Sequence, residues 1–149
     1  MKCIQTYNRA TEWISNMKDL PLFFIRIVLA YGFYNPAIMK WNNISSIAEW
    51  FDGMGIPLPT LNAYLAASTE MAAVILLPLG LATRIISIPL MITMLVAIFA
   101  VHYSNGFNAG DNGFEIPLYY LLMLFVLLIN GAGKFSLDGL FSRRLKCGV

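Results

Sequence analysis

Charged side chains are scarce in this sequence. They make up 12% of its 149 residues, whereas hydrophobic residues reach 58% and the mean hydropathy is +0.68. Soluble domains carry about 25% charged residues, and a small soluble domain cannot cover this much apolar surface. The net charge of +2 gives no indication of nucleic-acid binding. The composition therefore predicts an integral membrane protein whose partner is the lipid bilayer.

Cysteine and histidine are also scarce. The chain has only Cys3 and Cys147, one near each end, and the single histidine His102. No C-x-x-C pair is present, which argues against a thioredoxin-like or zinc-ribbon site. No serine–histidine–acid set and no phosphate-binding glycine motif can be recognised either. The sequence thus names no conventional catalytic centre.

Four apolar segments are long enough to cross a membrane as helices. About 20 residues, each rising 1.5 Å, span the hydrocarbon core. Proline 36 should kink or end the first of these helices. We predict an all-α protein, a single membrane domain built as a four-helix transmembrane bundle, with spans at about 20–38, 60–81, 85–101 and 116–132.

The segments that flank these spans are more polar. Residues 1–19 are mildly amphipathic and predict an interfacial segment that leads into the membrane. Residues 40–60 carry apolar side chains at helical spacing, which predicts a short interfacial helix between helices 1 and 2. Residues 133–149 form a basic tail.

The distribution of charge in the loops predicts the orientation. Eight of the ten lysines and arginines precede span one, lie between spans two and three, or follow span four. The opposite side has only Lys40, with four acidic residues. By the positive-inside rule, both termini are cytoplasmic. The predicted location is the bacterial cytoplasmic (inner) membrane, with several passes.

Ionisable residues inside the spans need partners, because a charge near the bilayer centre costs at least about 2.5 kcal/mol. Arg26 and Glu70 are the two such residues, and Lys40 lies at the rim of span one. Depths counted from the helix ends differ by about 8–9 Å for Arg26 and Glu70, which long side chains can bridge. One interpretation is therefore a buried Arg26–Glu70 pair that fixes helix registry. Alternatively, Arg26 extends to the cytoplasmic headgroups.

A functional interpretation of Glu70 stays open beside the structural one. Glu70 is the candidate catalytic residue, as a proton-handling or ligand-binding acid. The ligand pocket would then be formed by polar side chains of the first two spans. The candidates are Arg26, Tyr31, Tyr34, Asn35, Lys40, Asn62 and Glu70.

His102 allows a metal hypothesis at the outer side. It stands at the end of span three, and Asp111 and Glu115 lie in the loop that follows. Histidine with carboxylates can hold a divalent metal, and histidine with methionine can suit copper. No spacing here is a ligand signature, and a lone interfacial histidine is more often a loop or headgroup contact.

Three short motifs make the sequence resemble the DoxX family of membrane proteins. The first helix has Arg26 followed by LAYG at 29–32 and by Lys40. The second has Glu70 and then LGLATR at 79–84, and the chain closes with GAG and FSLD at 131–133 and 135–138. The order and spacing of these motifs cover about residues 20–140.

Two longer stretches resemble the HvfX-like branch of that family. They are GIPLPTLNAYLAASTE at 55–70 and NGFNAGDNGFEIPLYYLLMLF at 105–125. The resemblance implies an accessory role in the maturation of a copper-binding ribosomal peptide, beside a peptide-modifying enzyme and its partner protein. Other DoxX relatives are linked to quinone-dependent sulfur or thiol oxidation, but this chain has no central cysteine pair.

Three functions follow as hypotheses. The first is the accessory role in handling a copper-binding peptide, with or without a redox step. The second is a quinone-binding subunit of a membrane oxidoreductase in which Glu70 exchanges protons. The third is a non-catalytic membrane scaffold. Quinone and copper are the cofactors considered, a homodimer is open, and whether the chain is itself an enzyme stays undecided.

Overall fold

A computed structural model describes residues 17–146, with side chains described as far as residue 141. The predicted interfacial segment 1–19 falls mostly outside the described residues, as do Cys3 and Cys147. The described chain is all-α, as predicted. Three of its helical stretches are long and apolar enough to cross a membrane, and a shorter apolar helix accompanies them.

The helices follow one another with short connections. Helix α2 covers Asp19–Asn42, α3 covers Ile44–Gly53, α4 covers Pro59–Leu79 and α5 covers Thr83–Val96. A π-helical turn, Ala97–His102, and a 3-10 turn, Tyr103–Asn105, extend α5 to a continuous stretch of 23 residues. A second 3-10 turn, Ala109–Asp111, precedes α6 at Glu115–Asn130, and α7 follows at Leu137–Lys146.

Helix α2 passes through Pro36, so of the two expected effects, a kink or an end of the helix, the end is wrong. The helix continues for six residues to Asn42. Proline removes one backbone hydrogen bond, but membrane helices tolerate that loss when neighbouring helices hold the flanking turns. Here Ala37 is fully buried against the bundle and Lys40 forms an ion pair with Glu70 of α4. These contacts anchor the last turns of α2.

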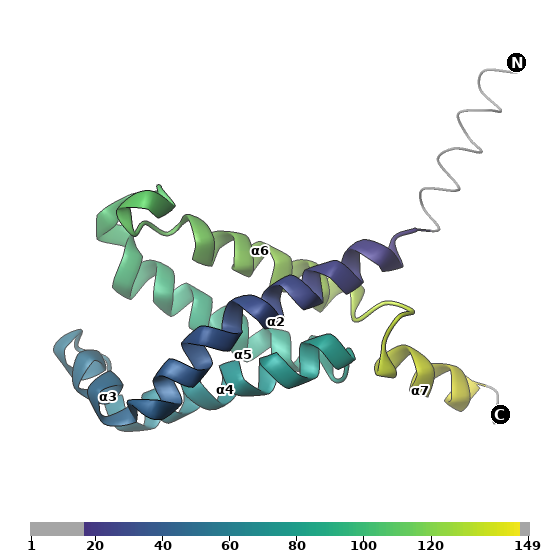
Figure 1. The fold of residues 1–149 in the computed structure, drawn as a ribbon, viewed down its shortest axis with the longest axis horizontal. Coiled ribbons are helices and arrows are strands. Elements are labelled where there is room, and N and C mark those ends of the chain that lie inside the picture. The colour runs from purple at the N-terminus through teal and green to yellow at the C-terminus, as the bar shows by residue number, and fades with distance from the viewer. Residues whose placement is uncertain (1–16, 147–149) are drawn as a thin grey trace, which may run out of the picture.

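The helices form two arms that meet at one end and diverge at the other (Figure 1). Helix α2 packs most extensively on α4, and α3 docks on α4 at the open end; α5 packs on α6 to make the second arm. A hydrophobic core joins the arms, with Leu29, Phe33, Leu77, Leu90 and Leu124 among its buried members. A smaller cluster of Ala48, Phe51 and Ala63 fixes α3 to α4.

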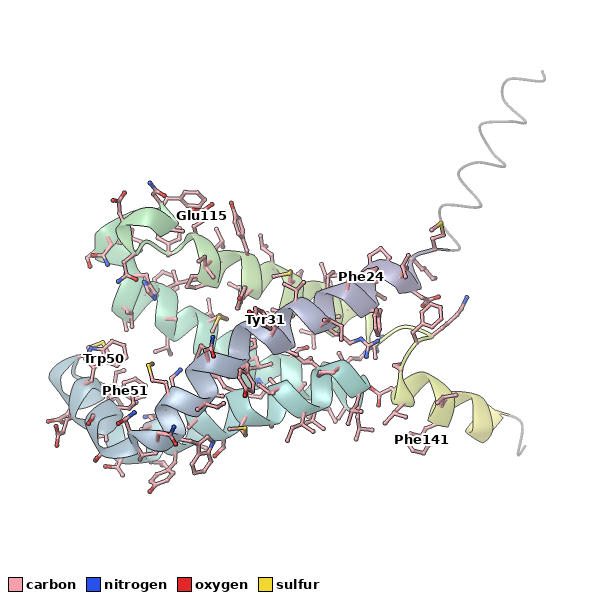
Figure 2. The ribbon with its side chains drawn as sticks, viewed as in Figure 1. Phe24, Tyr31, Trp50, Phe51, Glu115 and Phe141 are labelled. Atoms are coloured by element: carbon pink, nitrogen blue, oxygen red, sulfur yellow. The ribbon has the colours of Figure 1, made fainter. Side chains whose placement is uncertain are left out.

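The side-chain view shows which groups lie at the open end (Figure 2). Trp50 and Phe51 stand on α3, and Glu115 stands across from them at the start of α6. At the closed end, α7 extends beyond both arms and carries the exposed Phe141, while its first turn bonds to the backbone between α4 and α5. Apolar side chains cover much of the outer surface of the arms, which is the expected character of a lipid-facing surface. The open end is where the two arms are farthest apart.

Candidate functional site

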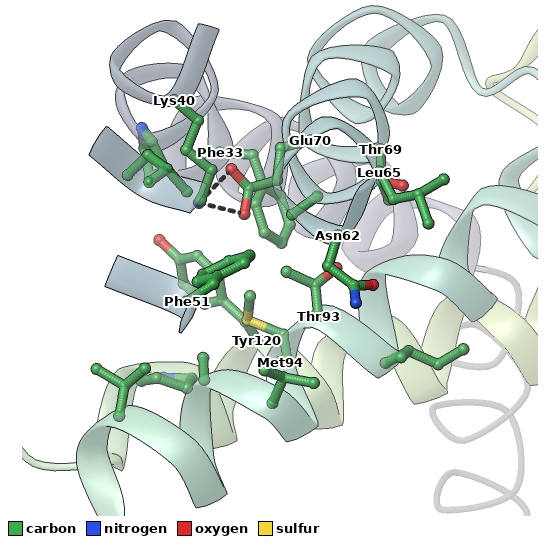
Figure 3. Close-up of a pocket in the computed structure, with 18 of the residues that line it drawn as sticks. Phe33, Lys40, Phe51, Asn62, Leu65, Thr69, Glu70, Thr93, Met94 and Tyr120 are labelled. Carbon is green, nitrogen blue, oxygen red and sulfur yellow. Dashed lines mark hydrogen bonds and ion pairs between the residues drawn. The ribbon is translucent and has the colours of Figure 1, made fainter. Parts of the chain in front are cut away.

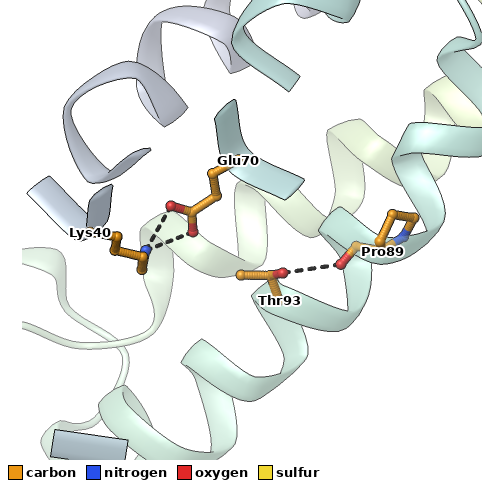
Figure 4. A network of polar contacts seen from close by, with 4 residues as sticks. All are labelled: Lys40, Glu70, Pro89 and Thr93. Atoms are coloured by element: carbon orange, nitrogen blue, oxygen red, sulfur yellow. Dashed lines mark hydrogen bonds and ion pairs between the residues drawn. The ribbon is translucent and has the colours of Figure 1, made fainter. Parts of the chain in front are cut away.

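An ion pair between Lys40 and Glu70 is the most deeply placed charged contact at the open end. The Lys40 ammonium donates to both carboxylate oxygens of Glu70, each at 2.7 Å (Figure 4). The Glu70 side chain is 2% exposed and the Lys40 side chain is 14% exposed. Two charges removed from water in this way must satisfy each other, because no bulk solvent remains to do so.

The helical period of α2 and α4 brings these two residues together. On α4, Ala63, Ala67, Glu70 and Ala73 recur at spacings of three and four, and all are buried. These small alanines let the backbone of α2 approach closely. Lys40 lies three residues after the buried Ala37 and so shares the buried face of α2. The sequence pattern thus aims both side chains at the same contact.

A cavity of about 600 Å³ lies beside this pair, between the two arms (Figure 3). That volume falls within the range of about 300–1,000 Å³ typical of small-molecule sites. Its walls are mostly apolar, with Lys40 and Glu70 on one side and Thr93 and Met94 across from them. Other wall residues come from α2, α3, α4 and α6 and include Phe33, Trp50, Phe51, Leu65, Ala66 and Tyr120.

One donor on Lys40 stays available to a ligand in this cavity. An ammonium group has three N–H donors, and Glu70 takes two of them. Within residues 17–146, the third has no partner. Because Lys40 lines the cavity, this donor can reach a carbonyl or hydroxyl oxygen placed there. The pair therefore offers a donor and a carboxylate acceptor at one point of an otherwise apolar wall.

Tyr120 supplies a second polar group that sequence reasoning missed. Its ring packs edge-on against Phe33, with ring centroids 5.5 Å apart. It also lies directly over Gly32, where any side chain would overlap the tyrosine ring. Its hydroxyl has no hydrogen-bond partner in the described part of the chain. Gly32 belongs to the LAYG motif, but nothing in the sequence connects it to a tyrosine of α6.

Two other polar side chains that line the cavity donate hydrogen bonds to backbone carbonyls. The Thr93 hydroxyl donates to the Pro89 carbonyl at 3.1 Å, within its own helix (Figure 4). The Asn62 amide donates to the Pro57 carbonyl at 2.6 Å. Asn62 is a predicted pocket residue that the cavity includes. Thr93 was not predicted, since a threonine in an apolar helix gives no distinctive signal.

Three predicted pocket residues lie elsewhere. Tyr31 is 80% exposed, Tyr34 is 50% exposed and Asn35 is also exposed. None of them is among the residues that line the cavity. They lie off the face of α2 that carries Phe33, Ala37 and Lys40, because a helix turns about 100° per residue. Of the seven predicted pocket residues, the structure brings Lys40, Asn62 and Glu70 to the cavity.

Arg26 does not pair with Glu70, so the predicted Arg26–Glu70 registry pair is wrong. The guanidinium is fully buried and donates to the carbonyls of Leu77 and Pro78 at 3.1 and 3.3 Å, and to the carbonyl of Phe135. These acceptors are a helix end and a loop, about 10 Å along α4 from Glu70. The alternative that Arg26 extends to the headgroups is also wrong, since the side chain is enclosed.

The carbonyls that Arg26 contacts explain its position. The last carbonyls of a helix have no partner within that helix, and a cation there also interacts favourably with the helix dipole. Leu77 and Pro78 belong to the last turn of α4. Arg26 therefore ties α2 to the end of α4 and to the loop before α7. Its role is structural and distinct from the cavity.

His102, Asp111 and Glu115 do not form a metal site. No group of three histidine, cysteine or acidic side chains suited to a metal occurs among residues 17–146. His102 Nδ1 lies 2.8 Å from the Asn112 carbonyl. The Glu115 carboxylate accepts hydrogen bonds from the Ala109 N–H at 3.0 Å and from the Tyr119 hydroxyl at 2.9 Å. These groups hold the loop to itself, although His102 also lines the cavity.

The chain is similar to one known protein family and to several individual proteins. The DoxX family model matches residues 21–103, more than half of the chain. An uncharacterized protein of Haemophilus influenzae is 35% identical over 126 residues, covering 82% of this chain and 83% of the relative. An uncharacterized membrane protein of Mycobacterium tuberculosis is 33% identical over 137 residues, covering 84% of each chain.

The name of a third relative includes an enzymatic activity. The CatD protein of Bacillus subtilis, named as a candidate oxidoreductase, is 26% identical over 121 residues, covering 80% of this chain and 86% of the relative. No solved structure matches the chain.

Proposed function

Because this chain belongs to the DoxX family of multi-pass membrane proteins, we propose that it binds a quinone-like ligand beside the Lys40–Glu70 pair. In this proposal it acts as the quinone-binding subunit of a membrane oxidoreductase. The observation that carries the proposal is the position of that ion pair on the wall of an apolar cavity of about 600 Å³. The name of the Bacillus subtilis relative supports a redox role.

The chemistry of a quinone matches the distribution of polarity in the cavity. A quinone is a flat apolar ring that carries carbonyl oxygens, and it usually has a hydrocarbon tail. The free N–H of Lys40 can donate to one carbonyl oxygen, and the Tyr120 hydroxyl can donate to another from α6. Phe33, Phe51 and Met94 present apolar or aromatic surface to the ring.

Glu70 would provide the proton-handling group of this site. A quinone supplies two-electron chemistry that is coupled to protons, so its binding site needs a residue that can hold a proton near a carbonyl oxygen. Among the described residues, Glu70 is hydrogen-bonded to Lys40 alone. A proton can therefore be exchanged at its carboxylate without breaking a wider network. In this proposal the electrons come from a partner subunit of the oxidoreductase.

We propose further that the arms form a four-span bundle with both termini in the cytoplasm. Helix α6 has 16 residues and is about 24 Å long, shorter than the hydrocarbon core of about 30 Å. It packs along α5, whose extended helix has 23 residues. Lys18, Arg84 and Lys134 all lie at the closed end. The positive-inside rule would then place this end in the cytoplasm.

The copper-peptide role has less support than the redox role. The HvfX-like resemblance rests on two stretches of sequence, and neither the family model nor the names of these three relatives mention copper or a peptide. No cluster of three histidine, cysteine or acidic side chains that could hold a metal occurs among the described residues. The quinone proposal is accordingly the one that the cavity supports.

The test is binding of a short-tailed quinone to the purified protein in lipid nanodiscs. Trp50 lines the cavity, so a bound quinone should quench its fluorescence in a saturable manner. Loss of a hydrogen bond to a charged group costs about 1.5–3 kcal/mol. We therefore expect Lys40→Met to weaken binding at least about 10-fold. A partial filling of the cavity by Ala66→Phe should weaken it without touching the ion pair.

The matched control is Glu49→Gln beside Glu70→Gln. Glu49 lies on α3, is exposed and does not line the cavity. Glu49→Gln should leave the dissociation constant unchanged, whereas Glu70→Gln should alter it. The proposal fails if the wild-type protein shows no saturable quenching. It also fails if binding is insensitive to both Ala66→Phe and Lys40→Met in variants that elute as folded protein.

A further inference from the structure

A second cleft lies at the closed end of the molecule, far from the Lys40–Glu70 pair along the helices. Its volume is about 670 Å³. It is formed by the start of α2, the turn between α4 and α5, and the segment that follows α6. Three basic residues line it, namely Lys18, Arg84 and Lys134. Asp19 and Asp138 also line it, so the three basic and two acidic residues give the cleft a formal net charge of +1.

Both acids are already engaged by other groups. The Asp138 carboxylate accepts from the backbone N–H groups of Ala82 and Thr83, at 2.9 and 3.1 Å, where α5 begins. The Asp19 carboxylate accepts from the Lys134 backbone N–H at 2.9 Å and pairs with the Lys134 ammonium at 3.3 Å. Lys134 and Asp19 thus neutralise each other. The hydrogen bonds of Asp138 are directed at a helix N-terminus, and its charge also interacts with that of the buried Arg26.

Lys18 and Arg84 therefore contribute positive charge that forms no ion pair with an acid of the described cleft. Arg84 donates through Nη2 to the Ile129 carbonyl at 3.0 Å. Its remaining N–H donors have no acceptor within residues 17–146, and neither does the Lys18 ammonium. The Arg84 guanidinium lies over Gly131, which has no side chain to cover it. The cleft thus contains N–H donors of Lys18 and Arg84 that have no hydrogen-bond acceptor in the described part of the chain.

The backbone adds further donors at the same place. The N–H groups of Ala132 and Gly133, which line the cleft, have no hydrogen-bond partner in the described part of the chain. Gly131 and Gly133 have φ values of +75° and +77°, a conformation that favours glycine. Unpaired backbone N–H groups beside a guanidinium are suited to an anion with several acceptor oxygens, such as phosphate.

The ends of three helices fix the depth of this cleft in the membrane. Helix α2 begins at Asp19, α5 begins at Thr83 and α6 ends at Asn130. In a membrane-spanning bundle, the ends of the spans lie at the level of the lipid headgroups. The phosphate groups available at that level belong to phospholipids. Basic pockets between membrane helices commonly hold anionic headgroups.

We propose that this cleft binds the phosphate group of an anionic phospholipid, held by Lys18 and Arg84 and by the backbone N–H groups of 132–133. Asp138 and Asp19 shape the cleft, and Lys134 neutralises Asp19. The site is separate from the cavity between the arms and does not depend on quinone binding. A lipid bound here would link the start of α2 to the turn between α4 and α5.

Native mass spectrometry of the protein released from nanodiscs tests this proposal. Wild-type protein should retain one phosphatidylglycerol in preference to phosphatidylcholine. A cationic side chain near anionic headgroups strengthens binding by about 5-fold. The Lys18→Gln/Arg84→Gln variant should therefore lose about 30-fold in affinity for phosphatidylglycerol. The comparison variant is Arg144→Gln/Lys146→Gln, which removes two positive charges from the C-terminal part of the sequence and should retain the lipid.

Three results would overturn the proposal. The first is equal loss of lipid from the cleft variant and the control variant, because this would assign binding to general surface charge. The second is equal retention of phosphatidylglycerol and phosphatidylcholine by the wild type. The third is binding of inorganic phosphate or glycerol phosphate, without lipid, at the affinity seen for phosphatidylglycerol. That result would assign the site to a free anion instead.

Discussion

Removing Lys40 should destabilise the protein more than removing Glu70, and the reason lies in their unequal burial. In Lys40→Met, the Glu70 carboxylate, 2% exposed, loses the ammonium that donates to both its oxygens. Among the described residues it has no other hydrogen-bond donor. Breaking a buried ion pair by removing one partner costs about 3–5 kcal/mol. We expect Lys40→Met to lower the free energy of unfolding by this amount.

Glu70→Met should cost less, about 1–2 kcal/mol, because the remaining lysine is 14% exposed and flexible. Its four-carbon stem can turn the ammonium toward water or headgroups. The double variant Lys40→Met/Glu70→Met leaves no unpaired charge, and replacing both members of a buried pair is often neutral or stabilising. Its stability should lie within about 1 kcal/mol of the wild type or exceed it.

The measurement is equilibrium unfolding in mixed micelles with increasing sodium dodecyl sulfate, followed by far-ultraviolet circular dichroism. Lys134→Met is the matched control, because Lys134 also pairs with a buried carboxylate but is itself 58% exposed, and Asp19 keeps the Lys134 backbone N–H as a donor in this variant. A pair with such an exposed partner should contribute only about 0–1 kcal/mol. Two results refute the reasoning: a loss in Lys40→Met no larger than in Lys134→Met, or a double variant as unstable as Lys40→Met.

Two further predictions concern packing and helix capping. Gly32→Ala should lower the free energy of unfolding by about 1–3 kcal/mol, because the new methyl group overlaps the Tyr120 ring. Gly53→Ala, with no atom near its added methyl, should be neutral or slightly stabilising in the same unfolding titration. Asp138→Ala should cost about 1–2 kcal/mol and increase hydrogen exchange at the Thr83 amide, since this carboxylate caps the start of α5. An unchanged Thr83 exchange rate would contradict the capping role.

Hydropathy predicts the helices well because lipid imposes one simple demand on every span. Backbone groups in the hydrocarbon core must bond within a helix, so a long apolar run leaves little choice. The amphipathic helix α3 was predicted for a similar reason, since its apolar residues recur at helical spacing. The end of the first helix was harder to predict. Pro36 signals a break locally, but contacts of Ala37 and Lys40 with α4 maintain the helix.

Pairing of the charged residues could not be obtained from depth alone. Counting residues placed Arg26 and Glu70 within reach of each other, and both are buried as expected. The count ignored backbone carbonyls, which at a helix end are acceptors for a buried arginine. Arg26 therefore donates to carbonyls of the last turn of α4 and of the loop at Phe135, and not to Glu70. Lys40 is the cation that lies at the level of Glu70 and pairs with it.

The polar residues of α2 line the cavity only if they lie on the same face of the helix as Phe33. Tyr31, Tyr34 and Asn35 are close to Lys40 in sequence but point away from the cavity. A helical-wheel comparison with Phe33 and Ala37 would have separated them. The contribution of Tyr120 could not have been inferred in this way, because it depends on how α6 packs against α2. Only the tertiary structure places a tyrosine over Gly32.

The two ends of the molecule differ in how their helices are tied, and this difference bears on where each proposed ligand enters. At the closed end, Arg26 and Asp138 bond to backbone groups of other elements, so the helix ends there are held by charged hydrogen bonds. At the open end, α3 docks on α4 through a small apolar cluster, while the loop before α6 bonds to itself. A ligand that enters from the bilayer must displace side chains between the arms. This is easier at the open end, where the Lys40–Glu70 ion pair joins two helices of the same arm and leaves the two arms free to separate. The cavity beside Lys40 therefore suits a ligand that exchanges, and the cleft beside Arg84 suits one that stays bound.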